Sequence, residues 1–378
     1  MRPKFEEGGK LHAFHSLFDA MDTFFYTPEQ TTVSGCHIRD AVDNKRTMFT
    51  VIIALIPALL FGMYNIGYQH YLSLGQVSCY CDNFWGNLGY GFLKILPMLL
   101  VSYIVGLGIE CIFAQIRKHE VSEGYFVTGM LIPLICPPDV PLWQLAIAVA
   151  FAVIIGKEVF GGTGYNFLNP ALVARAFLFF SYPSQMSGDT VWIAEQGDAI
   201  SGATPLGEML AGGGAPQASV LDMFLGFIPG SVGETSVIAI LIGAVILLVT
   251  GIASWRIMLS IFAGGAAMGL VFNMIGANPY MGMPFYYHFL IGGFMFGAVF
   301  MATDPVTAAQ TNTGKYIYGA LIGIMAVLIR VLNPAYPEGM MLSILLLNVF
   351  APLIDYYVVD ANIRRRAKRA KLLVKNNQ

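Results

Sequence analysis

Long apolar stretches constrain this chain more than any other feature of its sequence. A helix needs about 20 apolar residues to cross the hydrocarbon core of a membrane. Ten stretches approach that length: residues 47–66, 91–115, 122–137, 141–158, 170–184, 236–254, 256–275, 287–303, 315–331 and 340–358. They are unbroken rather than alternating, which argues against an outer-membrane β-barrel. The sequence therefore predicts an all-α polytopic membrane protein with about ten transmembrane helices.

The charge content excludes the main soluble classes of protein. Only 12% of the 378 residues are charged, which is about half the share in a soluble globular domain. That low share excludes a soluble enzyme and a disordered chain. The net charge of −2, without a basic face, excludes an ordinary nucleic-acid-binding protein.

The distribution of basic residues predicts the orientation. Lys and Arg gather before the first apolar stretch and after the last one. They also occur at the turns that an even number of spans places on the same side of the membrane as both termini. The segment 182–235 contains no Lys or Arg but six acidic residues. Since cytoplasmic loops carry the excess of Lys and Arg, we expect both termini in the cytoplasm and this segment outside.

These patterns divide the chain into five parts. They are a cytoplasmic segment over 1–46, a first transmembrane repeat over 47–184, a periplasmic loop over 185–235, a second repeat over 236–358 and a basic cytoplasmic tail over 359–378. Within the first part, apolar residues recur every three or four positions over 11–26, which predicts an amphipathic helix. It would lie on the membrane surface or, equally, against a partner subunit.

A repeated tetrapeptide indicates internal symmetry. The residues Leu-Asn-Pro-Ala occur at 168–171 and again at 332–335, each time before the fifth span of a five-span half. The two copies would enter the membrane from opposite sides, as expected for two inverted five-helix repeats. Prolines and glycines interrupt the region before each copy, and such breaks frame a ligand or ion path or are simple proline kinks.

One short run in the outer loop points to specific chemistry. It comprises Asp198, Ser201, Gly202, Ala203 and Thr204 in the order D-A-I-S-G-A-T. Taken alone, this is a small, flexible turn that carries hydroxyl groups. It resembles the flavin attachment site of the NqrB/RnfD family of membrane subunits of respiratory sodium pumps. In that family the threonine hydroxyl forms a phosphodiester with FMN, which implies covalent FMN on Thr204.

The resemblance extends over nearly the whole chain. It is carried by residues 25–28 (FYTP), 39–40 (RD), 118–121 (KHEV), 157–164 (KEVFGGTG), 301–305 (MATDP) and 333–339 (NPAYPEG). The long N-terminal segment favours the NADH:quinone reductase branch over the RnfD-type subunit of a ferredoxin:NAD oxidoreductase. A transporter or channel without cofactors is the alternative from a different class, because inverted five-span repeats are common in transporters.

The resemblance implies an enzyme subunit with cofactors and partners. It implies noncovalent riboflavin towards the cytoplasm in addition to the FMN, with electrons passing from NADH-derived carriers to quinone while Na⁺ is translocated. The expected partners are the A, C, D, E and F subunits of a six-subunit complex in the bacterial inner membrane, and a flavin transferase that attaches the FMN.

Acidic residues in or beside the spans are candidate sodium ligands. Glu110, Asp304 and Asp355 fall in the cytoplasmic half, where the family carries acids associated with Na⁺ uptake, and hard oxygen ligands suit this ion. The other interpretation is that they cap helices or pair with the intramembrane Arg175 and Arg330. Gly106 and Gly108 match the family's quinone-sensitive region, although Leu107 replaces one of its paired glycines.

Overall fold

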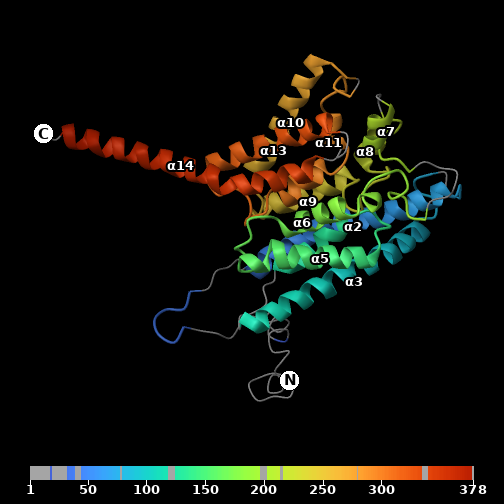
Figure 1. The fold of residues 1–378 in the computed structure, drawn as a ribbon, viewed down its shortest axis with the longest axis horizontal. Helices are drawn as coiled ribbons and strands as arrows, with labels where there is room; N and C mark the ends of the chain where they lie inside the picture. Colours follow the sequence, from blue (N-terminus) through green and yellow to red (C-terminus); the bar gives the residue numbers. More distant parts are fainter. Residues whose placement is uncertain are drawn as a thin grey trace.

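The computed structural model describes residue 18 and residues 32–38, 44–76, 79–117, 124–195, 202–212, 216–278, 280–333 and 339–376. Within these ranges all regular secondary structure is helical, and most of the long helices lie side by side (Figure 1). The amphipathic helix predicted over 11–26 lies outside the described residues, apart from Phe18.

The first half of the protein contains five helices that match the first five predicted spans. They are α2 (Asn44–Ser73), α3 (Phe84–Arg117), α4 (Gly124–Leu134), α5 (Leu142–Gly156) and α6 (Pro170–Ser181). The first copy of the repeated tetrapeptide starts α6: the Asn169 side chain accepts a hydrogen bond from the N–H of Ala171, and Pro170 occupies the first helical position. Both features favour a helix start.

The second half also contains helices at its predicted spans, but the span predicted over 287–303 is strongly interrupted. Its helices are α9 (Val237–Val249), α10 (Trp255–Ile275), α11 (Tyr287–Leu290), α12 (Phe294–Phe296), α13 (Asn312–Leu332) and α14 (Met340–Asn376). Between the halves lie two short helices, α7 (Pro205–Gly212) and α8 (Val220–Leu225), so the segment 185–235 is not only a loop.

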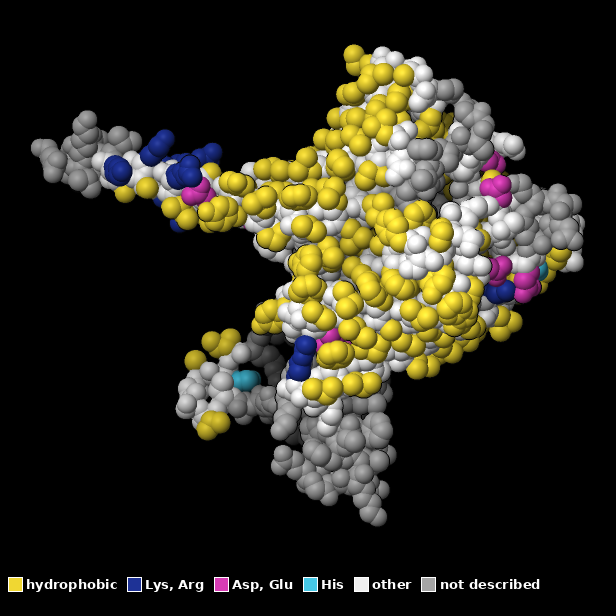
Figure 2. All heavy atoms as spheres, viewed as in Figure 1, with side chains coloured by type: hydrophobic (Ala, Val, Ile, Leu, Met, Phe, Trp, Pro, Cys, Tyr) yellow, Lys and Arg dark blue, Asp and Glu magenta, His cyan; other side chains and the backbone are white. Residues whose placement is uncertain are grey.

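Six of the described helices are long and apolar enough to cross a membrane: α2, α3, α5 with the turn that follows it, α10, α13 and α14. Three shorter apolar helices, α4, α6 and α9, accompany them. Large apolar side chains such as Leu93, Ile104 and Val249 are 68%, 69% and 82% exposed. This apolar exterior, visible across the face in Figure 2, identifies a polytopic membrane protein.

The stretch 287–303, predicted as a single span, is broken into three pieces. After α11 the chain turns at Gly292, whose φ is +65°, a conformation that glycine adopts far more readily than other residues. The short α12 then continues as a π-helix over Gly297–Met301. The expectation of one continuous helix was wrong here because the two adjacent glycines interrupt it.

Some helix contacts recur in both halves, whereas the close packing of α2 on α3 has no equally close counterpart between α9 and α10. In each half the second helix packs on the fourth (α3 on α5, α10 on α13) and the fourth on the fifth (α5 on α6, α13 on α14). The two halves meet through their first helices, α2 and α9, and their fifth, α6 and α14. Of the second tetrapeptide copy, Leu332 ends α13 and Asn333 caps it, while 334–335 lie outside the described residues.

The expected basic tail is a direct continuation of the last helix. α14 extends to Asn376 and projects from the body of the protein (Figure 1). Lys and Arg cover this projection, whereas Asp and Glu gather mainly on the opposite side of the body (Figure 2). The two ends of the protein therefore differ in charge.

The contact between α10 and α13 depends on glycine. A Cβ atom at Gly323 would overlap the carbonyl oxygen of Ile261, and one at Gly264 would overlap that of Ala320. Small residues let helix backbones approach closely in membranes, where packing rather than the hydrophobic effect drives association.

We therefore expect Gly323→Ala to destabilise the protein by about 1–3 kcal/mol, the usual cost of overpacking. Gly89→Ala in α3 is the matched control, because a Cβ there meets no atom within 4 Å and alanine favours the helix by up to about 1 kcal/mol. Denaturant unfolding of the purified protein in detergent measures both. Equal stability of the two variants would contradict the close approach.

Candidate cofactor and ion sites

An ion pair lies buried where α4 ends inside the protein. Arg175 of α6 donates to Oε1 of Glu234 at 2.8 Å and to the carbonyl oxygen of Ile135, and both charged side chains are 3% exposed. The N–H of Gly233 donates to the carbonyl oxygen of Leu134 at 2.7 Å. The broken helix end is thus satisfied within the protein, as it must be at membrane depth.

Arg330 has a comparable role at the break in the second half. Its Nη1 donates to the carbonyl oxygen of His288 in α11 at 2.6 Å, and the side chain is 1% exposed. A Cβ at Gly292 would lie 3.3 Å from Nη2 of Arg330, and one at Gly293 would lie 2.9 Å from the carboxylate of Glu234. Both breaks and both arginines therefore converge in one interior region.

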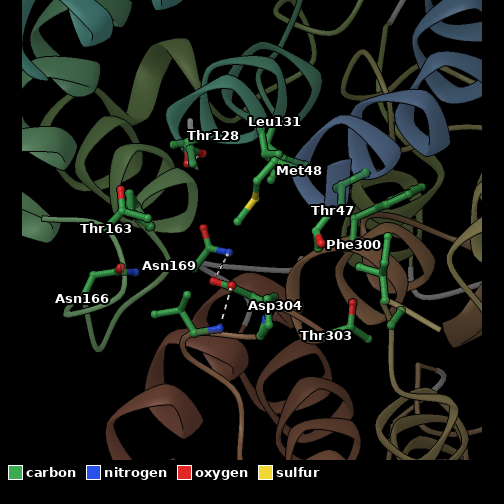
Figure 3. A pocket seen from close by; sticks show the side chains of 18 of the residues that line it. Thr47, Met48, Thr128, Leu131, Thr163, Asn166, Asn169, Phe300, Thr303 and Asp304 are labelled. Carbon is green, nitrogen blue, oxygen red and sulfur yellow. Dashed lines mark hydrogen bonds between the residues drawn. The ribbon is translucent and has the colours of Figure 1, made fainter. Parts of the chain in front are cut away.

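A pocket lies at the junction of the two halves. Its walls are the first turns of α2 and α4, the segment between α5 and α6, the end of α9 and the residues after the π-helix (Figure 3). The polar side chains that line it are Thr47, Thr128, Lys157, Thr163, Asn166, Asn169, Thr303 and Asp304. The hydroxyl of Thr163 is buried and has no hydrogen-bond partner among the described residues.

Asp304 joins the two halves at this pocket. Its carboxylate accepts hydrogen bonds from the N–H of Val306 at 3.1 Å, from the hydroxyl of Thr307 at 3.0 Å and from Nδ2 of Asn169 at 3.4 Å. Figure 3 shows the side chains of Asn169 and Asp304 pointing towards each other. Because Asn169 also caps α6, the start of that helix and the end of the broken span are held together.

Glu110 lies beside the pocket in a buried ion pair. Nζ of Lys157, which lines the pocket, donates to Oε1 of Glu110, and both side chains are 4% exposed. The next residue, Glu158, is held separately: Arg117 donates to its carbonyl oxygen at 2.6 Å and to its carboxylate at 3.3 Å. Two ion pairs therefore fix the end of α5.

Asp355 of α14 lies near the same end of the protein and binds the start of α13. Its carboxylate accepts hydrogen bonds from the N–H groups of Gln310 at 2.6 Å and Thr311 at 3.0 Å, and from the hydroxyl of Thr311. The structure thus brings Glu110, Asp304 and Asp355 to one end of the protein. Each of them has its own protein partners there.

The two glycines expected near quinone occupy different environments. A Cβ at Gly106 would overlap the ring of Tyr125, so this glycine is needed for packing. A Cβ at Gly108 would meet no atom of the described residues within 4 Å. Tyr125 also lies under the ammonium of Lys157, at 5.9 Å from its ring centre, which connects Gly106 to the Glu110 pair.

The expected attachment residue Thr204 lies at the start of α7. Its Oγ1 accepts a hydrogen bond from the N–H of Gly207 at 3.1 Å, and its side chain is partly exposed. Gly202 and Ala203 precede it, while Asp198 and Ser201 lie outside the described residues. A second pocket beside it is lined by Ala203, Pro205 and Glu208, together with Gln69 and Ser73 of α2.

The loop that leads to Thr204 is anchored to α3 at its beginning. Lys94 contacts Glu195 at 2.8 Å and Asp139 at 3.3 Å, and Oδ2 of Asp139 accepts a hydrogen bond from the N–H of Glu195 at 2.9 Å. Hydrogen bonds from Lys94 and then Tyr90 lower the pKa of Glu195. These contacts stabilise the charged form of the glutamate and hold the start of the loop.

Several residues of these sites were not predicted from the sequence. The sequence pattern predicts a cytoplasmic turn for Lys157 and the outer loop for Glu234. In the structure both side chains are buried, Lys157 in an ion pair with Glu110 and Glu234 in an ion pair with Arg175. Thr163 and Asn166, which line the pocket, have no signal of their own in the sequence. The glycine cluster Gly161–Gly164 directly before the first Asn-Pro was the available signal, because irregular backbone at membrane depth lines cavities or is buried in protein.

Comparison with known proteins gives a consistent result. The profile of the NQR2, RnfD, RnfE family matches residues 31–364. The chain is 51% identical over 391 residues to the B subunit of the Na(+)-translocating NADH-quinone reductase of Ectopseudomonas mendocina (strain ymp), covering 97% of this chain and 96% of the relative. The corresponding protein of Klebsiella pneumoniae (strain 342), with the same name, is 49% identical over 405 residues, covering 98% of each chain.

Proposed function

Since this chain belongs to the NQR2, RnfD, RnfE family, we propose that it is the membrane subunit through which a Na⁺-translocating NADH:quinone reductase passes electrons to quinone and moves Na⁺. The observation that carries this proposal is the identity of 51% over nearly the full length to a relative with that name. Its partners are the other five subunits, named A, C, D, E and F. The names of these relatives favour this role over that of an RnfD-type subunit.

The proposed topology has ten spans and two cytoplasmic termini. The six long helices are completed by the short α4, α6 and α9 and by the broken segment from α11 to the π-helix. The opposite charge of the two ends of the protein supports this orientation. The membrane is the bacterial inner membrane, with α7 and α8 on the periplasmic side.

We place covalent FMN on Thr204, attached by the flavin transferase. The residue fits this role because it is partly exposed and its neighbours Gly202 and Ala203 are small. Oγ1 also lies at the N-terminus of α7, next to the N–H of Gly207. The partial positive charge of a helix N-terminus favours a phosphodiester there. Asp198 and Ser201 complete the proposed recognition sequence.

We propose that noncovalent riboflavin binds at the pocket between the two halves. Threonine and asparagine side chains supply donors and acceptors for a polyhydroxylated chain, and Met48, Leu131 and Phe300 supply apolar walls. Among the described lining residues the one basic side chain is Lys157, which already neutralises Glu110. Because no second basic side chain among those residues would balance a phosphate, a flavin without a phosphate suits this pocket. Bound flavin would supply one- and two-electron transfer.

The proposed Na⁺ entry uses Glu110, Asp304 and Asp355. All three lie at the end of the protein that the topology assigns to the cytoplasm, and carboxylate oxygens are suitable ligands for a hard cation. Quinone is proposed to bind near Gly106 and Gly108 on α3. The cofactor-free transporter is the competing function, and the flavin experiments below distinguish the two.

Thr204→Val should abolish the covalent flavin, because valine keeps the shape but has no nucleophilic hydroxyl. Since Thr204 also caps α7, Thr204→Asn separates the two roles: asparagine keeps the cap and still lacks the hydroxyl. Flavin fluorescence of the denatured subunit in a gel should disappear in both variants. It should persist in Thr190→Val, the control in the same loop, and fluorescence that survives in Thr204→Asn would refute the attachment site.

Thr163→Val should lower the riboflavin content without loss of stability, because the hydroxyl that it removes has no partner among the described residues. A lost hydrogen bond of about 1 kcal/mol corresponds to roughly fivefold weaker binding. Riboflavin released by acid from the purified complex measures this effect. Thr50→Val, outside the pocket, serves as the control, and identical riboflavin affinity in both variants would argue against the pocket.

Asp304→Asn, Glu110→Gln and Asp355→Asn should each raise the Na⁺ concentration needed for half-maximal turnover, since an amide keeps the size and removes the charge. We expect the largest effect for Asp304, which lines the pocket. The carboxylate of Asp355 also stabilises the start of α13, so its loss would act partly on the fold. Turnover titrated with Na⁺ and covalent FMN content are measured together. Unchanged Na⁺ dependence in all three variants would leave these acids as helix caps and counter-ions.

A further inference from the structure

Two exposed cysteines lie in the turn between α2 and α3. They are Cys79 and Cys81, with Tyr80 between them. The N–H of Asp82 donates to the carbonyl oxygen of Cys79 at 3.1 Å, and the N–H of Cys79 donates to Oδ2 of Asp82 at 2.9 Å. These reciprocal hydrogen bonds close a tight turn over residues 79–82.

The turn gives the two cysteines a spacing that suits a disulfide. A hydrogen bond from the fourth residue of a turn to the first bends the backbone sharply between them. Since consecutive Cα atoms are about 3.8 Å apart, such a bend brings Cα atoms two residues apart to roughly 5–6 Å. The Cα atoms of a disulfide are usually about 4.4–6.8 Å apart.

Tyr80 connects this turn to the segment that contains α7 and α8. Its hydroxyl donates to Oδ1 of Asp222 in α8 at 2.6 Å, and its ring stacks on that of Phe227 with the ring centres 4.5 Å apart. Its carbonyl oxygen accepts a hydrogen bond from the hydroxyl of Tyr64 in α2. The two thiols therefore flank a residue that holds α8 against the end of α2.

The chemistry of the pair follows from its surroundings. Residues 74–83 contain no Lys or Arg, in agreement with a turn on the outer side of the membrane. The periplasm is oxidising and permits disulfides. A disulfide between Cys79 and Cys81 would contribute little stability, because its effect grows with the length of the loop that it closes. Exposed disulfides are readily reduced, so this pair suits reversible exchange.

We propose that Cys79 and Cys81 form a reversible disulfide on the outer face, and that this bond steadies the contact between Tyr80 and α8. The inference rests on the proposed function, which places this turn in the periplasm. The thiolate of one cysteine attacks a disulfide-bearing oxidant, forms a mixed disulfide and releases one thiol. The thiolate of the other cysteine then displaces the second thiol. Two electrons and two protons pass from the pair to the oxidant, which leaves as two thiols.

The first test determines the state of the thiols. Cells that contain the complete complex are treated with a permeant alkylating reagent before lysis, so that air cannot oxidise the thiols, and the digested protein is analysed by mass spectrometry. Cys79 and Cys81 should be joined and not alkylated, whereas Cys36, which is also exposed, should be alkylated. Reduction of the membranes with glutathione should make both members of the pair reactive. Alkylation of Cys79 and Cys81 without any reductant would overturn the inference.

A membrane-impermeant maleimide distinguishes the two reasons for such a failure. In reduced spheroplasts it should label Cys79 and Cys81 but not Cys36, which precedes the first span. If the pair is labelled from outside but is never oxidised, the disulfide is refuted and the proposed function stands. If Cys36 is labelled and the pair is not, the proposed orientation is wrong, and the inference fails with it.

The contact with α8 is tested by amide hydrogen exchange over residues 220–226 in the assembled complex. Exchange should be slower in the oxidised wild type than in the double variant Cys79→Ser with Cys81→Ser, and Cys36→Ser, the matched control, should behave as the wild type. Tyr80→Phe, which lacks the hydroxyl that binds Asp222, should reduce the difference between oxidised and reduced protein. Equal exchange in the double variant and in a wild type whose disulfide is verified by mass would overturn the role of the bond.

Discussion

The burial of Arg175 and Glu234 against the end of α4 is the interaction on which the rest of the structure depends. A helix that ends inside a membrane protein exposes carbonyl groups that lipid cannot satisfy, and Arg175 binds one of them while Glu234 balances its charge. The same helix, α6, carries Asn169 at its first turn, about 9 Å away along the helix axis. The ion pair in the core therefore also sets the position of the pocket wall.

Two buried pairs of opposite charges lie within the membrane region. Arg175 with Glu234 lies at the interrupted helices, and Lys157 with Glu110 lies beside the pocket. Such pairs contribute little net stability, but each resists the loss of one partner. A protein that moves cations benefits from this property, because an incoming charge must be matched by the rearrangement of another. A pocket adjoins the pair at Lys157.

The apolar stretches were sufficient to locate most helices, because span length and hydropathy are local properties. They were insufficient at Gly292 and Gly293, where the chain turns beside Arg330 and Glu234 from distant parts of the sequence. Glu234 was assigned to the outer loop for the same reason: only the fold brings it to Arg175. Thr204 came from resemblance to a family, since a short threonine-containing turn has no physical signature of its own. The glycine cluster before Asn169 indicates irregular backbone, but only the fold shows that residues of both halves meet there to line a pocket.

The unbroken helix of α14 has a practical consequence. Arginine, lysine and alanine are good helix formers, so the basic end of the chain continues the last span as one rod to Asn376. Each added helical residue advances about 1.5 Å and rotates about 100°. A helical protein fused in register to this rod would hold a defined distance and rotation relative to the membrane core. It would serve as a rigid marker for particle alignment in electron microscopy.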